Sequence, residues 1–308
     1  MVIAVIGQGS IGRRHVGNLQ DLGADVEGIA WRDFDRGSFE TRSDIKGIVI
    51  ATATEVRLEL VRMAAGMAVP VYIEKPLHWT RAGVADIYDT LGDLAQRSML
   101  GFMARYHPVV QALAAQDLSD VYGFTFEIGH DVRQWRQDWS FPKSYAARAE
   151  GGGVLLDLCH EVDMAKALFP DLTVDHVTSV GHADFVGVDF ASRIALSGGR
   201  VAGTVAMDYL SPVSLRRAEV NGTRAARSLD LLAATLTVDS GTAETTPYPY
   251  DRNDMFRAIT RDWLALIEDA EAPLQPLAPR LSDMRASSDL IAEAWGKRQF
   301  AGTAQMSF

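Results

Sequence analysis

Cysteine, positive charge and long apolar runs are all scarce in this sequence. The 308 residues include one cysteine, Cys159, which excludes an internal disulfide framework and indicates a reducing compartment. Acidic residues outnumber basic ones, 40 to 30, and the net charge of −10 argues against a nucleic-acid partner, because phosphates require a basic face. No apolar run is long enough to span a membrane, and no signal peptide precedes the first apolar strand. We therefore expect a cytoplasmic protein that binds neither nucleic acid nor membrane.

The composition is otherwise that of an ordinary globular protein, with 47% hydrophobic and 23% charged residues. A chain of this length can form two domains with buried cores, and it contains no internal repeat or low-complexity tail. A compact basic group, Arg13-Arg14-His15, lies near the N-terminus. We interpret it as a solvated turn of a helix.

The first hundred residues alternate short apolar runs with amphipathic stretches, a pattern typical of parallel βαβ units. The segment 32–46 is too short and too polar for the usual helix and strand, so we expect this part of the Rossmann unit to be trimmed. The expected strands are 2–6, 26–30, 48–51, 71–73 and 99–102, and the expected helices are 11–22, 57–65 and 82–95.

Beyond residue 108, glycine, serine and asparagine separate many β-rich segments, which indicates an antiparallel meander. The sequence therefore predicts an α/β protein with a Rossmann domain over 1–119 and a second domain over 120–308. The last expected helix, 281–296, would be able to pack back on the first domain. The expected strands are 121–130, 174–181, 193–196, 201–210, 218–220 and 234–239, and the expected helices are 154–169, 253–269 and 281–296.

The run V-I-A-V-I-G-Q-G-S-I-G over residues 2–12 is the most informative motif. An apolar strand leads into a G-x-G-x-x-G turn and a helix follows, which is the context in which this turn binds a dinucleotide. Gly7, Gly9 and Gly12 suit a tight turn, close approach to a pyrophosphate, and tight helix–strand packing. The N–H groups at the helix start, at Ser10 and Ile11, would face the phosphates. The alternative is a purely structural strand–turn–helix.

A second motif, Glu74-Lys75-Pro76, directly follows the expected strand 71–73. Ligands of open α/β sheets bind beyond the carboxyl ends of the strands, so Lys75 would project toward a cofactor. A cis bond before Pro76 would fix the direction of the lysine. The alternative is an ordinary surface turn.

The third motif is G-G-G-V-L-L-D-L-C-H-E-V-D, residues 151–163. The three glycines would let the backbone approach a ligand or the other domain closely. Asp157 and His160 are three positions apart, hence on one face of the expected helix. A histidine oriented by a carboxylate can exchange the hydroxyl proton of an alcohol near neutral pH, as hydride transfer requires. The alternative is an Asp–His contact on the helix surface.

Other side chains near this helix suggest different chemistry. Cys159 points to another helix face, so we expect it to pack in the interior and not to act as a nucleophile. The group around His160 matches no strong zinc signature, so no metal site is predicted. Trp135 and Tyr145 lie in the polar loop before the helix, where they could stack on a sugar ring or anchor the loop.

Taken in order, the motifs resemble the glucose–fructose oxidoreductase, inositol dehydrogenase and rhizopine-catabolism family (Gfo/Idh/MocA) along nearly the whole chain. The matching segments are G-Q-G-S-I-G-R-R-H at 7–15, I-A-T-A-T at 50–54, E-K-P-L at 74–77, R-Y-H-P at 105–108, the 151–163 motif, and D-R-N-D-M-F at 251–256.

The resemblance implies a Rossmann domain followed by an α+β domain that is built on a large, open, mostly antiparallel sheet. That second domain would bind substrate and pair in homodimers or homotetramers. Lys75 would contact the substrate and the nicotinamide ribose, His160 would donate or accept a proton, and Asp157 would position the substrate. The further implied residues are Thr52, Thr54 and Glu74 at the cofactor and Arg105 at the substrate.

The sequence departs from the family pattern at four places. Asp157 and His160 are three residues apart, where the best-known sugar dehydrogenases of the family have a spacing of four. The other three departures are Ala53 for a proline, Arg57 for a histidine and Met103 for an asparagine. These changes leave cofactor binding intact.

The resulting hypothesis is an NAD(P)-dependent oxidoreductase that moves a hydride between nicotinamide and a carbohydrate or polyol. At the end of the second expected strand, Arg32 favours NADP because it would meet a 2′-phosphate, whereas Asp33 keeps NAD open. One alternative is a reductase of imines or other carbonyls, whose less polar pocket Met103 and Trp135 would suit. The other is a non-catalytic sensor that binds NAD(P).

Overall fold

The computed structural model describes residues 2–134 and 140–308. The chain divides into two compact units, each made of two segments. Unit 1 comprises Met1–Tyr106 with Asp251–Ser288, and unit 2 comprises His107–Tyr250 with Asp289–Phe308. This division differs from the predicted domains 1–119 and 120–308 in two ways, since residues 107–119 belong to unit 2 and residues 251–288 belong to unit 1.

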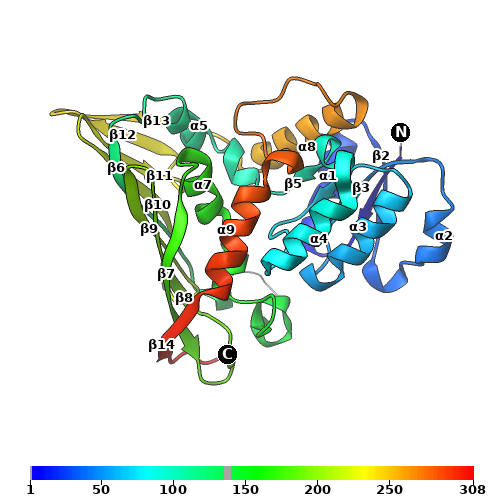
Figure 1. Cartoon of the computed structure of the whole chain (residues 1–308), viewed down its shortest axis with the longest axis horizontal. Helices are drawn as coiled ribbons and strands as arrows, with labels where there is room; N and C mark the ends of the chain where they lie inside the picture. Colours follow the sequence, from blue (N-terminus) through cyan, green and yellow to red (C-terminus); the bar gives the residue numbers. More distant parts are fainter. Residues whose placement is uncertain (1, 135–139) are drawn as a thin grey trace. The chain divides into compact units, whose positions relative to one another are not determined.

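Unit 1 contains a parallel five-stranded sheet in the order β2-β1-β3-β4-β5 (Figure 1). Each of its strands was expected from an apolar run, and the predicted Rossmann-like fold is confirmed. The central strands β1, β3 and β4 are buried on both faces except at Val2 and Lys46, as parallel strands covered by helices usually are. The strands are β1 (Val2–Ile6), β2 (Asp25–Ile29), β3 (Ile45–Ile50), β4 (Val71–Ile73) and β5 (Met99–Leu100).

The helices of unit 1 begin at or close to the expected positions. Between β2 and β3 the chain forms a three-residue 3₁₀ turn and the five-residue helix α2, so the predicted trimming of this segment is confirmed. The helices are α1 (Ser10–Asp21), α2 (Arg36–Glu40), α3 (Arg57–Gly66), α4 (Arg81–Leu91) and α8 (Arg252–Glu268).

Helix α8 joins unit 1 from far along the sequence. It starts at a capping box formed by Asp251 and Asp254, and its Trp263 is fully buried with its ring 5.7 Å from that of Tyr72. A Cβ atom at Gly47 of β3 would lie 3.1 Å from Trp263 and 2.7 Å from Ile267. Because Gly47 has no side chain, α8 can pack closely against the sheet.

Unit 2 contains a nine-stranded sheet in the order β13-β12-β11-β10-β6-β9-β8-β7-β14 (Figure 1). Neighbouring strands are antiparallel except in the pairs β6–β9 and β7–β14, so the predicted large, mostly antiparallel sheet is confirmed. Strands β11, β13 and β14 were not predicted. The strands are β6 (Val121–Gly129), β7 (Thr173–His182), β8 (Ala191–Gly198), β9 (Val201–Asp208), β10 (Leu215–Gly222), β11 (Ala226–Asp230), β12 (Thr235–Asp239), β13 (Ala243–Pro247) and β14 (Arg298–Ala304).

Helices α5 and α7 of unit 2 lie against one face of this sheet (Figure 1). The single helix expected over 154–169 is wrong: the chain forms two helices, and Leu158 and Cys159 separate them. Leu158 adopts φ −103° and ψ 25°, which ends the first helix, and the second helix starts two residues later, at His160. The helices are α5 (Pro108–Ala114), α6 (Val154–Asp157), α7 (His160–Leu168) and part of α9 (Arg285–Gly296). Helix α9 is divided between the units, and its residues from 289 on belong to unit 2.

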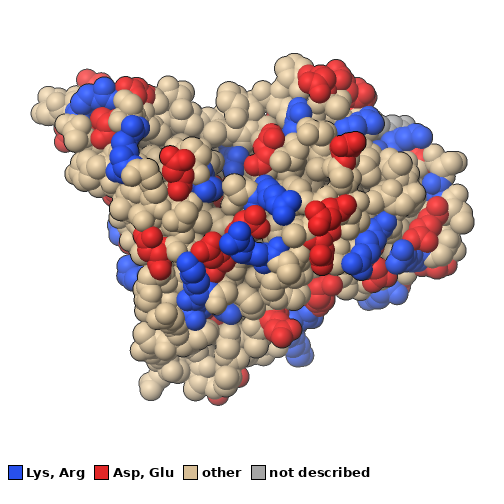
Figure 2. All heavy atoms as spheres, viewed as in Figure 1, with Lys and Arg blue, Asp and Glu red and all other residues tan. Residues whose placement is uncertain are grey.

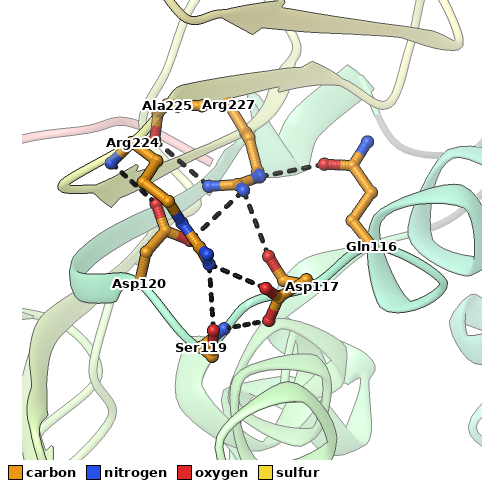
Figure 3. Close-up of polar contacts among 7 residues, drawn as sticks. All are labelled: Gln116, Asp117, Ser119, Asp120, Arg224, Ala225 and Arg227. Carbon is orange, nitrogen blue, oxygen red and sulfur yellow. Dashed lines mark hydrogen bonds and ion pairs between the residues drawn. The ribbon is translucent and has the colours of Figure 1, made fainter.

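A polar network ties the β10–β11 hairpin to the turn that precedes β6 (Figure 3). Arg227 of β11 is buried and donates to the side chains of Gln116, at 2.9 Å, and Asp120, at 3.3 Å. Arg224 in the hairpin turn donates to Asp117 at 2.8 Å. Because buried charges need partners, this network fixes the hairpin to one register of the sheet.

On the face drawn in Figure 2, acidic and basic side chains are interspersed. No helix within residues 2–134 and 140–308 is long and apolar enough to cross a membrane.

The packing of α1 gives a first prediction. A Cβ at Gly12 would lie 1.7 Å from the carbonyl oxygen of Gly7, whereas a Cβ at Gly17 of the same helix meets nothing within 4 Å. Gly12→Ala should therefore lower the free energy of unfolding by about 1–3 kcal/mol through overpacking. Gly17→Ala should raise it by up to about 1 kcal/mol, because alanine favours the helix. Chemical denaturation of the two variants measures both effects, and equal effects would contradict this packing.

Candidate active site

At two of the three glycines in the turn after β1 a side chain would clash with the backbone, and at the third there is room for one. Gly7 has φ 103°, and a Cβ there would lie 2.5 Å from the carbonyl oxygen of Ala51. Gly12 packs against the carbonyl of Gly7, whereas a Cβ at Gly9 meets nothing within 4 Å. Gly9 also caps α1 without a side chain, and the first-turn amides of a helix have no intrahelical partner. The turn therefore fits a pyrophosphate approaching at Gly9.

The predicted side chains at the ends of β2 and β3 differ in exposure. Arg32 is the most open, with 87% of its side chain exposed and its Nε 3.5 Å from Asp33 Oδ2. Thr54 is buried, and Thr52 has a buried hydroxyl with no hydrogen-bond partner among the described residues. A buried hydroxyl without a partner in the protein is a candidate contact for a ligand.

The Glu74-Lys75-Pro76 turn follows β4, as expected, and the Lys75–Pro76 bond is cis. Arg57, at the start of α3, is 4% exposed and clamps this turn. Its guanidinium donates to the carbonyls of Thr52 at 3.2 Å and Lys75 at 3.3 Å, and also to that of Pro76. Arg57 thus joins the carboxyl ends of β3 and β4 and fixes the backbone that carries Lys75.

Glu74 faces the protein interior. Its Oε1 lies 2.8 Å from Nε2 of His15, a residue of α1 that is 1% exposed. The interpretation of His15 as part of a solvated helix turn is therefore wrong. His15 lies on the face of α1 that also buries Gly12, Asn18 and Leu19, and the packing of α1 carries it inward. Its spacing of three from Gly12 was a signal for this face.

In unit 2, the carboxylate of Asp157 accepts hydrogen bonds from two phenols. Tyr145 donates to Oδ1 at 2.6 Å and Tyr209 donates to Oδ2 at 2.9 Å. Asp157 is 4% exposed and Tyr209 is fully buried. Burial, reinforced by the neighbouring Asp157, raises the pKa of Tyr209 well above its ordinary value, so this phenol keeps its proton. Tyr209 lies on no sequence motif and was not predicted.

His160 is the first residue of α7, whereas Asp157 is the last residue of α6. The expectation that the two share one face of one helix is therefore wrong, because the helix is interrupted between them. His160 and Cys159 are both buried. An ion pair of 2.6 Å between Glu161 and Arg216 of β10 fixes the start of α7 to the sheet.

The G-G-G segment packs within unit 2. Gly153 has φ 90°, and a Cβ there would lie 1.9 Å from Asp189 Oδ1. A Cβ at Gly152 would lie 2.4 Å from the carbonyl oxygen of Arg148 and 2.7 Å from that of Tyr145. Asp189 is fully buried and accepts from the amide of Leu155 at 2.9 Å. The glycines therefore seat the loop that carries Tyr145 on the start of α6.

Two other residues, Arg105 and Trp135, were predicted to bind substrate. Arg105 is 9% exposed and donates to the Leu277 carbonyl and the Ser287 hydroxyl, both at 3.3 Å and both in unit 1. Trp135 lies outside the described residues. Within the described parts of the chain, no group of three or more His, Cys, Asp or Glu residues could hold a metal ion.

The chain thus combines a Rossmann-like sheet, which carries the glycine turn open at Gly9, with a large mixed sheet. This combination defines a class of two-domain proteins with a Rossmann-like first domain. Residues 106–227 match the family model of the GFO/IDH/MocA C-terminal domain. Over this segment the chain is similar to the Gfo/Idh/MocA family.

Two curated relatives are similar to part of the chain. An inositol 2-dehydrogenase of Acidothermus cellulolyticus is 28% identical over 200 residues, which cover 58% of this chain and 56% of that protein. The rhizopine catabolism protein MocA of Rhizobium meliloti is 23% identical over 183 residues, which cover 54% and 56%. The matched segments thus span about half the length of these relatives.

Solved structures share the fold over almost the entire chain. UDP-N-acetylglucosamine 3-dehydrogenase GnnA from Acidithiobacillus ferrooxidans has a TM-score of 0.76 at 17% identity, covering 97% of this chain and 96% of its own. KijD10, a 3-ketoreductase from Actinomadura kijaniata, has a TM-score of 0.78 at 15% identity, covering 98% and 99%. At these identities the likeness establishes the fold.

Tyr209 and Tyr72 are both fully buried, so a comparison of the two tests the hydrogen bond from Tyr209 to Asp157. Tyr209→Phe should lower the free energy of unfolding by about 1–3 kcal/mol, because it leaves a buried carboxylate short of a donor. Tyr72 is equally buried, but its hydroxyl has no hydrogen-bond partner in the described residues. Tyr72→Phe should therefore be neutral or stabilising by up to about 1 kcal/mol. Thermal or urea unfolding would contradict the assigned contacts if Tyr209→Phe proved neutral.

Proposed function

We propose that the protein is an NAD(P)-dependent oxidoreductase that transfers a hydride between nicotinamide and a hydroxyl or carbonyl carbon of a carbohydrate or polyol. The observation that carries the proposal is the pairing, within unit 1, of two features at the carboxyl ends of the strands. One is the glycine turn that is open at Gly9, and the other is the clamped turn that carries Lys75. The edge formed by these strand ends is where α/β sheets bind nucleotides.

The relatives support the substrate class. One curated relative is named as an inositol 2-dehydrogenase, and structures of the same fold include a levoglucosan dehydrogenase with NADH and the 3-ketoreductase KijD10 with NADP. Each of these names describes the oxidation of a hydroxyl or the reduction of a ketone. The family and the fold of this chain are consistent with the same reaction type.

The bound nicotinamide would supply or accept the hydride. Gly7, Gly9 and Gly12, with the amides of Ser10 and Ile11, would hold the pyrophosphate at the start of α1. Lys75 would bind the reacting oxygen and the nicotinamide ribose, and its positive charge would stabilise negative charge that develops on that oxygen. His160 would take the hydroxyl proton during oxidation and return it during reduction. Asp157 would orient the substrate.

NADP is the cofactor that we favour. Arg32 at the end of β2 is 87% exposed, and its ion-pair partner Asp33 is also largely exposed, so the guanidinium is accessible to a 2′-phosphate. Asp33 would instead serve the ribose hydroxyls of NAD. Thr52, Thr54 and Glu74 would complete the surroundings of the cofactor.

We further propose that the protein acts as a homodimer or homotetramer in the cytoplasm. The support for pairing is the size of the nine-stranded sheet of unit 2, which carries helices α5 and α7 on one face. A single buried cysteine is consistent with a reducing compartment.

Cofactor choice can be tested at Arg32. Arg32→Ala should weaken NADPH binding about tenfold, equivalent to about 1.4 kcal/mol, and leave NADH binding unchanged. Arg36→Ala is the control, because Arg36 lies nearby but pairs with Glu40 at 2.6 Å. Fluorescence titration of the unaltered protein and both variants with each reduced cofactor measures the six affinities. An equal loss for NADPH and NADH, or a preference for NADH in the unaltered protein, would overturn the choice of NADP.

The catalytic assignment can be tested by turnover on a panel of polyols and sugars with both cofactors. Lys75→Ala and His160→Ala should each lower kcat by about 10²–10⁴-fold, because they remove the charge or the proton carrier from the reaction. Lys46→Ala and His176→Ala, at exposed positions, should retain full activity. Tight NADPH binding with no turnover of any compound would instead favour the sensor function.

A further inference from the structure

Within unit 1, His15 joins the helix that starts at the glycine turn to the turn that carries Lys75. Its Nε2 lies 2.8 Å from Oε1 of Glu74, the residue before Lys75. The ring is 1% exposed and packs edge-on against Tyr72 of β4, with 4.8 Å between the ring centroids. His15 therefore contacts both the strand that leads into the turn and the first residue of the turn.

The surroundings of the His15 ring indicate which nitrogen carries the hydrogen. Nδ1 is buried and has no hydrogen-bond partner among the described residues. A hydrogen on Nδ1 would be a buried donor without an acceptor, which is costly. A hydrogen on Nε2 is accepted by the Glu74 carboxylate. His15 is therefore the donor and Glu74 the acceptor of this bond.

Glu74 is held by neighbours from three elements. Its backbone amide donates to the carbonyl of Ile50 at 3.1 Å, which extends the pairing of β3 with β4 by one residue. A Cβ at Gly101, directly after β5, would lie 3.1 Å from the carboxyl carbon and from both oxygens of Glu74. The carboxylate thus fits beside a residue without a side chain, and His15 of α1 supplies its hydrogen bond.

At its other end, α1 is joined tightly to the glycine turn. A Cβ at Gly12 would lie 1.7 Å from the Gly7 carbonyl oxygen, and the amide of Arg13 donates to the carbonyl of Gly9 at 3.0 Å. The first turn of α1 is also the place proposed for the pyrophosphate. One helix therefore connects the pyrophosphate position with the turn that carries Lys75.

The Lys75 turn is fixed from two different helices. Arg57, at the start of α3, donates to the carbonyls of Lys75, at 3.3 Å, and of Pro76. His15 of α1 holds Glu74, on the preceding side of Lys75. Loss of the His15 bond would leave the contacts of Arg57 in place and would release the residue before the lysine.

We propose that His15 is a positioning residue, which acts through Glu74 to set the orientation of Lys75 relative to a dinucleotide at the start of α1. The inference rests on the proposed function for the role of Lys75. His15 is itself too buried to reach a ligand. Its effect on the reaction is therefore indirect, and it passes through the hydrogen bond to Glu74.

The test compares two buried polar residues on one face of α1. His15→Phe keeps a ring against Tyr72 and removes the donor, whereas His15→Gln keeps a donor. Asn18→Ala is the matched control, because Asn18 is 2% exposed but accepts from the side-chain amide of Asn253 at 2.7 Å. Thermal unfolding shows first that each variant is folded, and His15→Ala replaces His15→Phe if the latter is not.

The first measurement does not depend on turnover. The chain has five lysines, so labelling with ¹⁵N-lysine gives five backbone amide signals, and the signal of Lys75 is the one that Lys75→Arg lacks. Nitrogen relaxation then gives the order parameter of the Lys75 amide, in the free protein and with NADPH. It should be about 0.85 in the unaltered protein, as in rigid backbone, and about 0.6 in His15→Phe.

The other variants separate positioning from general stability. His15→Gln should restore the order parameter of Lys75, because its amide group can donate to Glu74. Asn18→Ala should lower the melting temperature and leave the order parameter of Lys75 as it is in the unaltered protein, because its lost partner lies on α8.

Turnover gives the second measurement. His15→Phe should lower kcat by about 10–100-fold, because a small misplacement of a reacting group has an effect of this size. It should leave the dissociation constant for NADPH unchanged, because the glycine turn is intact. In a Glu74→Ala background, His15→Phe should cause no further loss of kcat, since both changes remove one interaction.

Four results would overturn the inference. They are an unchanged Lys75 order parameter in His15→Phe, an equal loss of order in Asn18→Ala, no restoration by His15→Gln, and losses of kcat that multiply in the His15 and Glu74 double variant. Failure of the proposed oxidoreductase activity would look different. Lys75 would still lose order in His15→Phe, while the unaltered protein would turn over no sugar or polyol with either cofactor.

Discussion

A buried charged group must keep its hydrogen bonds, and this constraint shapes the candidate functional residues of each unit. In unit 1 the charge is the guanidinium of Arg57, which is shared among the carbonyls of two strand ends and the Lys75 turn. In unit 2 it is the carboxylate of Asp157, which is held by two phenols. Removing a partner from such a group costs more than the bond itself contributes, because the charge stays buried. Each group therefore fixes the conformation of the segments that supply its partners.

The same constraint bears on two of the departures from the family pattern. Arg57 stands where the family commonly has a histidine, and its longer, forked donor group reaches three carbonyls. The shorter spacing between Asp157 and His160 coincides with a break between α6 and α7. The break, and not the periodicity of a single helix, sets the relation between these two residues. Sequence patterns that assume one continuous helix misjudge it.

The sequence was sufficient to predict the elements that depend on local apolar patterns. The strands Val2–Ile6 and Val71–Ile73 are continuous apolar runs, and the glycine turn between β1 and α1 has a motif of its own. Strand β13 could not be predicted, because every one of its residues is exposed and one is a proline. The attachment of α8 to unit 1 depends on Gly47, which has no side chain and so leaves room for Trp263. This role of Gly47 can be recognised only when the partner Trp263 is known. Long-range packing of this kind leaves no periodic signal.

The candidate site was predictable to a similar extent. Lys75 and the glycines lie on short motifs, whereas Tyr209, Asp189 and His15 act through partners that are distant in sequence or through an unexpected burial.

Cys159, between α6 and α7, has no exposed surface and is the one thiol of the sequence. A maleimide or nitroxide reagent therefore has no native target in the folded protein. A second cysteine placed on the surface would accept a single spectroscopic label without prior removal of the native one.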